Sequence, residues 1–332
     1  MKKKILLLTT GGTIGSVESD NGLTPVLPWK SLIECIPEAS EICELTSKPV
    51  ILNDSSNGLD SANMRPENWV EIAKAVYNEL VFSESENYSG IVITHGTDTM
   101  AYTSSMLSFM ITNLDKPVIL TGSQRPMSDP FPDAKKNLLD AVRVAVEGNP
   151  GVYIVFGGRI IKGINASKVH TEANEAFASI NYPLSGRIEG KAVIMDYPLP
   201  PGTGGAKLDT NIVKEVYLLK LTPGIDPNII DTIVYKGYKG IVIEVFGLGG
   251  LPNEFLDPVR NAIEKGVVVV GMTQARYGKT DFETYETGRK ALKAGLIPVS
   301  NMTAEAAVTK LMWVLGHTTK RKKIKKMMQK DL

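Results

Sequence analysis

Residues 90–100 read Gly-Ile-Val-Ile-Thr-His-Gly-Thr-Asp-Thr-Met, and the fold prediction starts from this segment. Its β-branched, mostly apolar run at residues 91–94 is typical of a strand buried on both faces. Gly96 then allows a tight turn, and short hydrogen-bonding side chains precede a helical pattern over residues 100–114. Ligands bind at the carboxyl ends of strands in open α/β sheets. The polar residues directly after the turn are therefore candidates for a functional site.

A second stretch, residues 4–15, has the same organisation. A short apolar run predicts a strand, and Thr-Thr-Gly-Gly-Thr-Ile-Gly follows it. Parallel strands of one sheet deliver their following loops to the same edge. We therefore expect the hydroxyl groups of Thr13 and Thr97 to meet, although 84 positions separate them (97 − 13).

Alternating strand and helix patterns continue to about residue 195 and predict an α/β fold. The predicted strands cover residues 50–52, 118–120 and 152–156. One predicted helix starts at Pro66, and another covers residues 134–146. This alternation argues for a mostly parallel sheet with helices on both sides. The polar, Gly-containing residues 16–25 indicate a mobile loop beside Thr13.

A second, smaller α/β domain is expected after a linker. Residues 198–205 read Pro-Leu-Pro-Pro-Gly-Thr-Gly-Gly, which regular structure does not accommodate. We predict a larger N-terminal domain over residues 1–195, a linker over 196–212 and a C-terminal domain over 213–332. A chain of 332 residues with 43% hydrophobic content can form two cores.

Composition narrows the partners and the compartment. The net charge of +1 provides no global attraction for nucleic acid, and the basic run at residues 320–330 is typical of a solvated helix end. No apolar run approaches the roughly 20 residues of a membrane span, and the N-terminal one is too short for a secretory signal. Nothing requires Cys35 and Cys43 to pair. We expect a cytoplasmic protein without nucleic-acid or membrane partners.

Several common chemistries lack their sequence patterns. The three histidines, His95, His170 and His317, show no ligand spacing with cysteines or carboxylates, which argues against a metal site. A Gly-x-Ser-x-Gly motif and a nucleotide-binding glycine motif are also missing. We predict no metal and no organic cofactor, and we assign His95 to a structural role. Trp29, Trp69 and Trp313 are assigned to packing.

Threonine remains as the candidate nucleophile. A hydroxyl group needs an adjacent base, often oriented by a third group. Asp98 lies beside Thr97 in the sequence, and a lysine such as Lys168 can accept a proton if burial lowers its pKa. This arrangement follows the logic of a Ser-Lys pair with threonine in place of serine. Taken singly, Thr13 would be a turn residue and Lys168 a surface lysine.

The motifs together resemble those of the bacterial-type L-asparaginases, the asparaginase/glutaminase family. The resemblance covers essentially the whole chain in the family's order. It is carried by Thr10-Gly11-Gly12-Thr13-Ile14, His95-Gly96-Thr97-Asp98-Thr99-Met100, Asp60-Ser61, Gly122-Ser123-Gln124-Arg125-Pro126 and Ser167-Lys168. It implies a larger N-terminal and a smaller C-terminal domain, with active sites between the subunits of a homo-oligomer, a dimer or a tetramer.

The resemblance implies the catalytic roles. Thr13 matches the nucleophile that attacks the side-chain amide of L-asparagine and gives an acyl-enzyme and ammonia, after which water releases L-aspartate. Thr97, Asp98 and Lys168 match the triad that activates the nucleophile or the water. The backbone N–H groups of Thr13 and Thr97 match the family's oxyanion hole.

The resemblance also implies the substrate-binding residues. Ser61 matches the residue that binds the α-carboxylate, and Asp98 the one that pairs with the α-ammonium group. Ser123 matches the position whose main-chain carbonyl holds the amide, and Asp60 is a neighbouring candidate.

Three positions depart from the family pattern. The loop after the nucleophile reads Gly-Leu-Thr-Pro at residues 22–25 instead of carrying a tyrosine, and Tyr285 is a candidate substitute. Ala62 replaces a glutamine, and Gly250 replaces an asparagine of some members. The alternatives are a dual glutaminase-asparaginase, a glutamyl-tRNA amidotransferase subunit, whose usual extra N-terminal domain we expect to be missing, and a non-catalytic amino-acid sensor.

Overall fold

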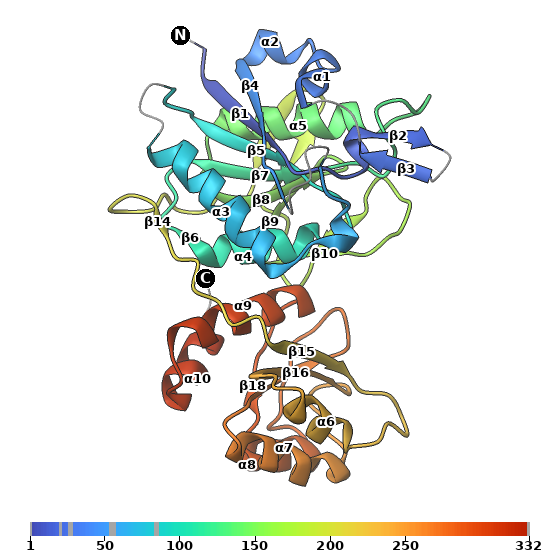
Figure 1. Cartoon of the computed structure of the whole chain (residues 1–332), viewed down its shortest axis with the longest axis vertical. Helices are drawn as coiled ribbons and strands as arrows, with labels where there is room; N and C mark the ends of the chain where they lie inside the picture. The colour runs from blue at the N-terminus through green and yellow to red at the C-terminus, as the bar shows by residue number, and fades with distance from the viewer. Residues whose placement is uncertain (1, 20–21, 26–28, 53–57, 83–85, 331–332) are drawn as a thin grey trace. The chain divides into compact units, whose positions relative to one another are not determined.

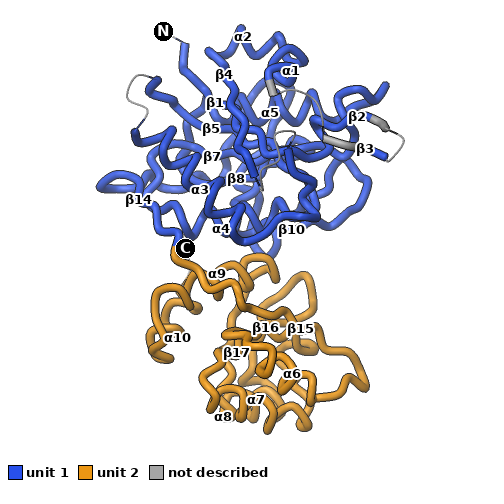
Figure 2. Tube along the Cα trace, in the orientation of Figure 1, with its two compact units in different colours: residues 1–210 blue, residues 211–332 orange. Residues whose placement is uncertain are grey.

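The chain forms two compact units, Met1–Thr210 and Asn211–Leu332 (Figure 2). The computed structural model describes residues 2–19, 22–25, 29–52, 58–82 and 86–330. The units divide inside the predicted linker at residues 196–212, and the predicted domain boundaries stay a prediction. Each unit contains a sheet flanked by helices (Figure 1). This arrangement confirms the predicted α/β class, with a larger N-terminal and a smaller C-terminal part.

Unit 1 is built on an eight-stranded sheet. Its strands, in spatial order, are β13 (Ala192–Met195), β12 (Gly186–Glu189), β9 (Arg159–Lys162), β8 (Gly151–Phe156), β7 (Pro117–Thr121), β5 (Gly90–Thr94), β1 (Lys4–Thr9) and β4 (Glu44–Pro49). The pairs from β8 to β4 are parallel, and those from β8 to β13 are antiparallel. β5 and β7 are buried along their whole length, as their apolar runs require.

Helices cover both faces of this sheet. The helices of unit 1 are α1 (Trp29–Glu34), α2 (Ala39–Ile42), α3 (Pro66–Val81), α4 (Met100–Met110) and α5 (Ala134–Glu147). Because side chains alternate across a strand, Ile5 and Leu7 join one buried cluster with residues of α1, α2 and α5. Leu6 and Leu8 are also buried, and α3 and α4 contact the sheet without joining that cluster. Figure 1 shows α5 apart from α3 and α4.

Short elements complete unit 1. They are the 3₁₀ turns η1 (Thr13–Gly15) and η2 (Ser61–Asn63) and three two-stranded ribbons: β2 (Ser16–Ser19) with β3 (Gly22–Pro25), β10 (Ala166–Lys168) with β11 (Phe177–Ser179), and β6 (Ile111–Thr112) with β14 (Lys207–Leu208).

Three local predictions differ from the structure. Residues 16–25 were expected as a mobile loop, but their described parts pair as the antiparallel strands β2 and β3. The strand expected at residues 50–52 ends earlier, as β4 at Pro49. The helix expected over residues 100–114 ends at Met110, because the chain then turns into β6 and pairs with β14.

Unit 2 has a four-stranded parallel sheet. Its strands, in spatial order, are β15 (Val216–Lys220), β16 (Gly240–Val245), β17 (Val268–Thr273) and β18 (Ile297–Pro298). Its helical elements are α6 (Ile229–Tyr235), η3 (Asn253–Phe255), α7 (Leu256–Glu264), α8 (Glu286–Ala294), α9 (Ala304–His317) and α10 (Arg321–Gln329).

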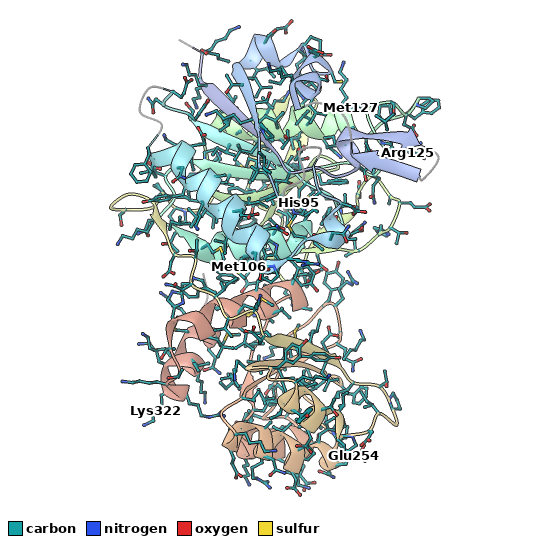
Figure 3. All side chains as sticks on the ribbon, in the orientation of Figure 1. His95, Met106, Arg125, Met127, Glu254 and Lys322 are labelled. Atoms are coloured by element: carbon teal, nitrogen blue, oxygen red, sulfur yellow. The ribbon has the colours of Figure 1, made fainter. Side chains whose placement is uncertain are left out.

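The basic C-terminal run forms the helix α10. Lys322, labelled in Figure 3, is exposed, while Ile324 and Met328 are buried. This pattern is that of an amphipathic helix with a solvated basic face. Among the residues that the structure describes, no helix has the length and apolar character needed to cross a membrane.

Candidate active site

The loops after β1 and β5 lie against each other at the carboxyl edge of the unit 1 sheet. Thr9 pairs with Thr94 in the parallel register, and the Thr10 hydroxyl donates to the Thr94 carbonyl at 2.8 Å. A Cβ on Gly12 would lie 2.4 Å from the Gly96 nitrogen, so only glycine permits this approach. The loops that carry Thr13 and Thr97 are therefore packed backbone to backbone.

The loop that carries Ser61 joins the same edge. A Cβ on Gly96 would lie 2.4 Å from the Ser61 hydroxyl oxygen, and the Thr99 hydroxyl donates to the Ser61 carbonyl at 2.9 Å. Ser61 is buried within η2. Asp60 is the N-cap of this turn, because its Oδ1 accepts the Ala62 N–H at 3.0 Å. Asp60 thus fixes the loop that presents Ser61.

A lysine contacts both the hydroxyl group of Thr97 and the carboxylate of Asp98, which follow β5. Lys168 Nζ donates to Thr97 Oγ1 at 2.8 Å and to Asp98 Oδ1 at 2.7 Å. Lys168 lies on β10, where it pairs with Phe177 of β11. The Thr97 residue is buried, whereas the Asp98 side chain is 60% exposed. Asp98 can therefore hold the ammonium group of Lys168 and still face a ligand.

Gln124 also contacts Thr97, which the sequence alone does not indicate, although Gln124 lies within the motif at residues 122–126. The Thr97 hydroxyl is 3.4 Å from Gln124 Oε1, and Gln124 Nε2 donates to the Thr171 carbonyl at 2.9 Å. Gln124 thereby connects the turn after β7 with Thr97 and with the segment after Lys168.

Ser123 lies in that turn after β7. Its hydroxyl oxygen is buried and has no hydrogen-bond partner among the described residues. The Asp133 carboxylate accepts the N–H groups of Gln124 and Arg125 at 2.9 Å each, and Asn137 donates to the Gly122 carbonyl at 3.0 Å. The start of α5 thus holds the turn in place.

His95 is fully buried at the end of β5, within unit 1 (Figure 3). Its Nδ1 lies 2.7 Å from the Gly96 carbonyl oxygen, and its Nε2 lies 2.8 Å from Thr103 Oγ1. Trp69 Nε1 donates to the same hydroxyl at 3.0 Å. Burial lowers the pKa of the imidazole to about 4, so the ring is neutral at neutral pH. Trp69 is buried, as expected; the side chain of Trp29 lies outside the described residues.

Tyr285 belongs to unit 2, where it directly precedes α8 and is 58% exposed. Its role as a substitute for the family tyrosine stays a prediction.

Over the described part of the chain, no group of three histidine, cysteine or acidic side chains is placed to hold a metal ion. Cys35 and Cys43 are free, and burial raises the pKa of the Cys43 thiol to about 11.

The arrangement of unit 1 fits acyl transfer. It combines two glycine-held loops with hydroxyl groups, a lysine in contact with a threonine and an aspartate, and a buried serine with an unused hydroxyl group. The Lys168 amine lies where it can exchange a proton with the Thr97 hydroxyl group.

Comparisons with known proteins agree with this geometry. Residues 4–200 match the model of the asparaginase N-terminal domain, and residues 215–328 match that of the glutaminase/asparaginase C-terminal domain. The L-asparaginase of Thermococcus kodakarensis is 41% identical over 99% of this chain and 98% of its own length. Its solved structure superimposes with a TM-score of 0.89 at 40% identity, covering 99% of this chain and 97% of the other.

Two further relatives show the breadth of the similarity. The L-asparaginase I of Vibrio cholerae has a TM-score of 0.86 at 32% identity, covering 100% of this chain and 98% of the other. A glutamyl-tRNA(Gln) amidotransferase subunit of Pyrococcus furiosus is 39% identical over 98% of this chain and 74% of its own length. Because both domain models match and the similarity spans nearly the whole sequence, the chain belongs to the asparaginase family.

Proposed function

We propose that the protein hydrolyses the side-chain amide of L-asparagine to L-aspartate and ammonia through a threonine acyl-enzyme. The observation that carries this proposal is the position of Lys168 Nζ, which lies within hydrogen-bonding distance of both Thr97 Oγ1 and Asp98 Oδ1. The family relationship and the L-asparaginase relatives support the choice of reaction.

The first half-reaction forms the ester. The Thr13 hydroxyl oxygen attacks the amide carbon, the carbonyl π electrons move to oxygen, and the backbone N–H groups of Thr13 and Thr97 stabilise the oxyanion. When the tetrahedral intermediate collapses, the carbon–nitrogen bond breaks, and the nitrogen takes up the proton that the Thr13 hydroxyl gave up and leaves as ammonia.

The second half-reaction uses the Lys168 triad. Water attacks the ester carbon and gives up a proton to Thr97 Oγ1, while Thr97 passes its own proton to Lys168 in its neutral amine form. The Asp98 carboxylate, 2.7 Å from Lys168 Nζ, stabilises the ammonium group that results. The ester bond to Thr13 then breaks, the Thr13 oxygen takes up the proton held by Lys168, and L-aspartate leaves.

The amino-acid end of the substrate has matching groups. We assign the α-ammonium group to the exposed Asp98 carboxylate and the α-carboxylate to the Ser61 hydroxyl, with Asp60 as the cap that holds Ser61. The Ser123 main-chain carbonyl is assigned to the amide nitrogen. No metal or organic cofactor enters these steps.

One assay separates this function from its alternatives. Purified protein is given L-asparagine, L-glutamine or D-asparagine over a concentration series, and ammonia release is followed. We expect release from L-asparagine; equal release from L-glutamine would indicate the dual enzyme, and binding of L-asparagine without release would indicate a sensor. Thr13→Ala and Thr97→Ala should abolish release while the melting temperature stays near that of the wild type. Unfolding of these variants would contradict catalytic roles.

The amidotransferase relatives favour a second candidate function, in which ammonia is delivered to a partner enzyme. Ammonia release by the isolated chain at a rate that no added partner changes would argue against it.

We also propose a cytoplasmic homo-oligomer, a dimer or a tetramer. A 26% identical neighbour is described as a probable cytoplasmic L-asparaginase of Campylobacter jejuni. Sedimentation of the purified protein tests the assembly.

A further inference from the structure

The two proposed oxyanion donors belong to peptide groups whose carbonyls are both held from inside unit 1. The Thr13 N–H shares its peptide plane with the Gly12 carbonyl, which accepts the Ser16 hydroxyl at 3.1 Å and the Gly15 N–H at 3.2 Å. The Thr97 N–H shares its plane with the Gly96 carbonyl, which lies 2.7 Å from His95 Nδ1. Because a trans peptide is planar, holding the carbonyl fixes the opposite direction of the N–H.

The hydrogen bonds that lead from Trp69 to the Gly96 carbonyl all have the same donor-to-acceptor direction. The Trp69 indole nitrogen can only donate, and the Gly96 carbonyl can only accept. Thr103 Oγ1 therefore accepts from Trp69 at 3.0 Å and donates to His95 Nε2 at 2.8 Å, which leaves the His95 proton on Nδ1. The neutral tautomer is thus assigned from the partners at both ends.

The front side of both peptides is available to a ligand. Within the described ranges, neither the Thr13 N–H nor the Thr97 N–H has a protein acceptor. The two peptides start at adjoining residues, since a Cβ on Gly12 would lie 2.4 Å from the nitrogen and 2.7 Å from the Cα of Gly96. Two adjacent donors held from behind and unpaired in front match the geometry that an oxyanion requires.

We propose that Ser16 and the chain Trp69–Thr103–His95 are positioning residues that hold the Gly12–Thr13 and Gly96–Thr97 peptides with their N–H groups aimed at the developing oxyanion. This inference rests on the proposed amide hydrolysis and deepens it. None of the four side chains touches the substrate. Their function is to prevent either peptide from rotating and turning its carbonyl toward the negative charge, so that the donors need no reorganisation during the reaction.

Two substitutions of His95 separate positioning from packing. The side-chain amide nitrogen of Asn can occupy the place of Nδ1, so His95→Asn keeps a donor to the Gly96 carbonyl and loses the contact with Thr103. The amide of Gln can occupy the place of Nε2, so His95→Gln keeps the contact with Thr103 and loses the donor to Gly96. Gln also fills more of the buried volume, so a packing role ranks Gln above Asn, whereas a positioning role ranks Asn above Gln.

The expected result is a split between kcat and binding. We expect His95→Gln to lower kcat for L-asparagine about 30-fold to 100-fold, somewhat less than the loss of a whole oxyanion donor, and His95→Asn to recover most of that loss. KM for L-asparagine and competitive inhibition by L-aspartate should change less than about threefold. Equal kcat values for the wild type and His95→Gln, or greater activity of Gln than of Asn, would overturn the inference.

Ser16→Ala provides a second test if the His95 variants fold poorly. It removes one of the two donors to the Gly12 carbonyl and leaves the Gly15 N–H, so kcat should fall about tenfold with little change in KM. The matched control is Thr309→Val in unit 2, which removes a buried hydroxyl that donates to the Glu305 carbonyl at 2.7 Å, and kcat should not change. A Ser16→Ala enzyme with wild-type kcat would contradict the role of Ser16.

Trp69→Phe tests the far end of the chain. It keeps an aromatic ring and removes the donor to Thr103, and we expect a kcat loss of a few fold, smaller than that of His95→Gln. A larger loss than that of His95→Gln would indicate a packing effect and argue against the chain. Failure of the proposed function is distinguishable, because the wild-type protein would then release no ammonia; failure of this inference leaves an active wild type and active variants.

Discussion

The burial of His95 makes the stability of the protein depend on pH. The pKa of this imidazole falls from 6.5 to about 4 in the folded chain because burial disfavours the charged ring, and the Gly96 carbonyl opposes the shift only in part. At pH 7 the ring is neutral in both the folded and the unfolded state, so it contributes no pH dependence there. Below pH 6.5 the imidazole binds a proton in the unfolded state but stays neutral in the folded state until the pH approaches 4. The free energy of unfolding therefore falls.

The size of this loss follows from the two pKa values. A difference of 2.5 units (6.5 − 4) at about 1.36 kcal/mol per unit gives a loss of about 3 kcal/mol, complete only below pH 4. At pH 5 the unfolded state is largely protonated and the folded state is not, which gives a loss of about 2 kcal/mol relative to pH 7. This is a large fraction of the typical stability of a domain.

The measurement is urea unfolding at pH 7 and pH 5 for the wild type and His95→Asn. The Asn side chain does not titrate, so the drop between the two pH values should be about 2 kcal/mol smaller in the variant than in the wild type. His170→Asn is the matched control, because His170 is exposed, and it should keep the wild-type drop. Equal drops for the wild type and His95→Asn would refute the claim that His95 is buried neutral.

Three further outcomes test separate parts of the molecule. Lys168→Met removes the contacts to Thr97 and Asp98, so it should lower the rate of ammonia release by at least about 10³-fold. Its melting temperature should stay near that of the wild type. Near-full turnover of this variant would remove Lys168 from the mechanism. Asp60→Ala should cost about 1 kcal/mol of stability through the lost cap and raise KM for L-asparagine more than it lowers kcat, as urea unfolding and steady-state kinetics would show. Lys310→Met should speed hydrogen exchange at the end of α10, because the buried Lys310 ammonium donates to the carbonyls of Met328 and Lys330; unchanged exchange there would show that this anchor is dispensable.

The sequence predicts the central strands well because their surroundings are uniform. β5 and β7 are buried on both faces, so each carries an unbroken apolar run. β4 lies at the sheet edge, and its residues Glu44–Pro49 are only partly buried, so its sequence lacks a strand pattern. The strand is predicted at residues 50–52 instead, because these residues are apolar. Edge strands are therefore placed by tertiary pairing, which the local pattern does not contain.

The candidate site divides in the same way. The loops that carry Thr13 and Thr97 can be predicted to lie at one edge, because each follows a buried parallel strand and such strands share an edge. Lys168 cannot be placed from periodicity, since it lies on the short ribbon β10–β11 and reaches residues 70 and 71 positions earlier in the chain. The logic of a Ser-Lys pair makes it a candidate, and the family resemblance implies its place in the triad. The sequence does not single out Gln124 within its motif, because its contacts with Thr97 and Thr171 exist only in the folded chain.

His95 was assigned to a structural role from its place at a strand end, and its partners explain what such a role consists of. Trp69 on α3 and Thr103 on α4 lie 34 positions apart and meet because α3 packs against α4. A buried imidazole needs partners for both nitrogens, and Thr103 and Gly96 supply them. The same bonds that satisfy the ring also fix the Gly96–Thr97 peptide.

Thr97 ties the two halves of the proposed chemistry to one short turn. Its side-chain oxygen contacts Lys168, and its backbone N–H belongs to the peptide held by His95. A rotation of that peptide would therefore move the acid–base contact and the oxyanion donor together. A turn with both functions gains from rigidity, and the hydrogen bonds of the buried His95 ring fix one orientation of the peptide. The fold thus uses buried hydrogen bonds behind the site to set the direction of the groups in front of it.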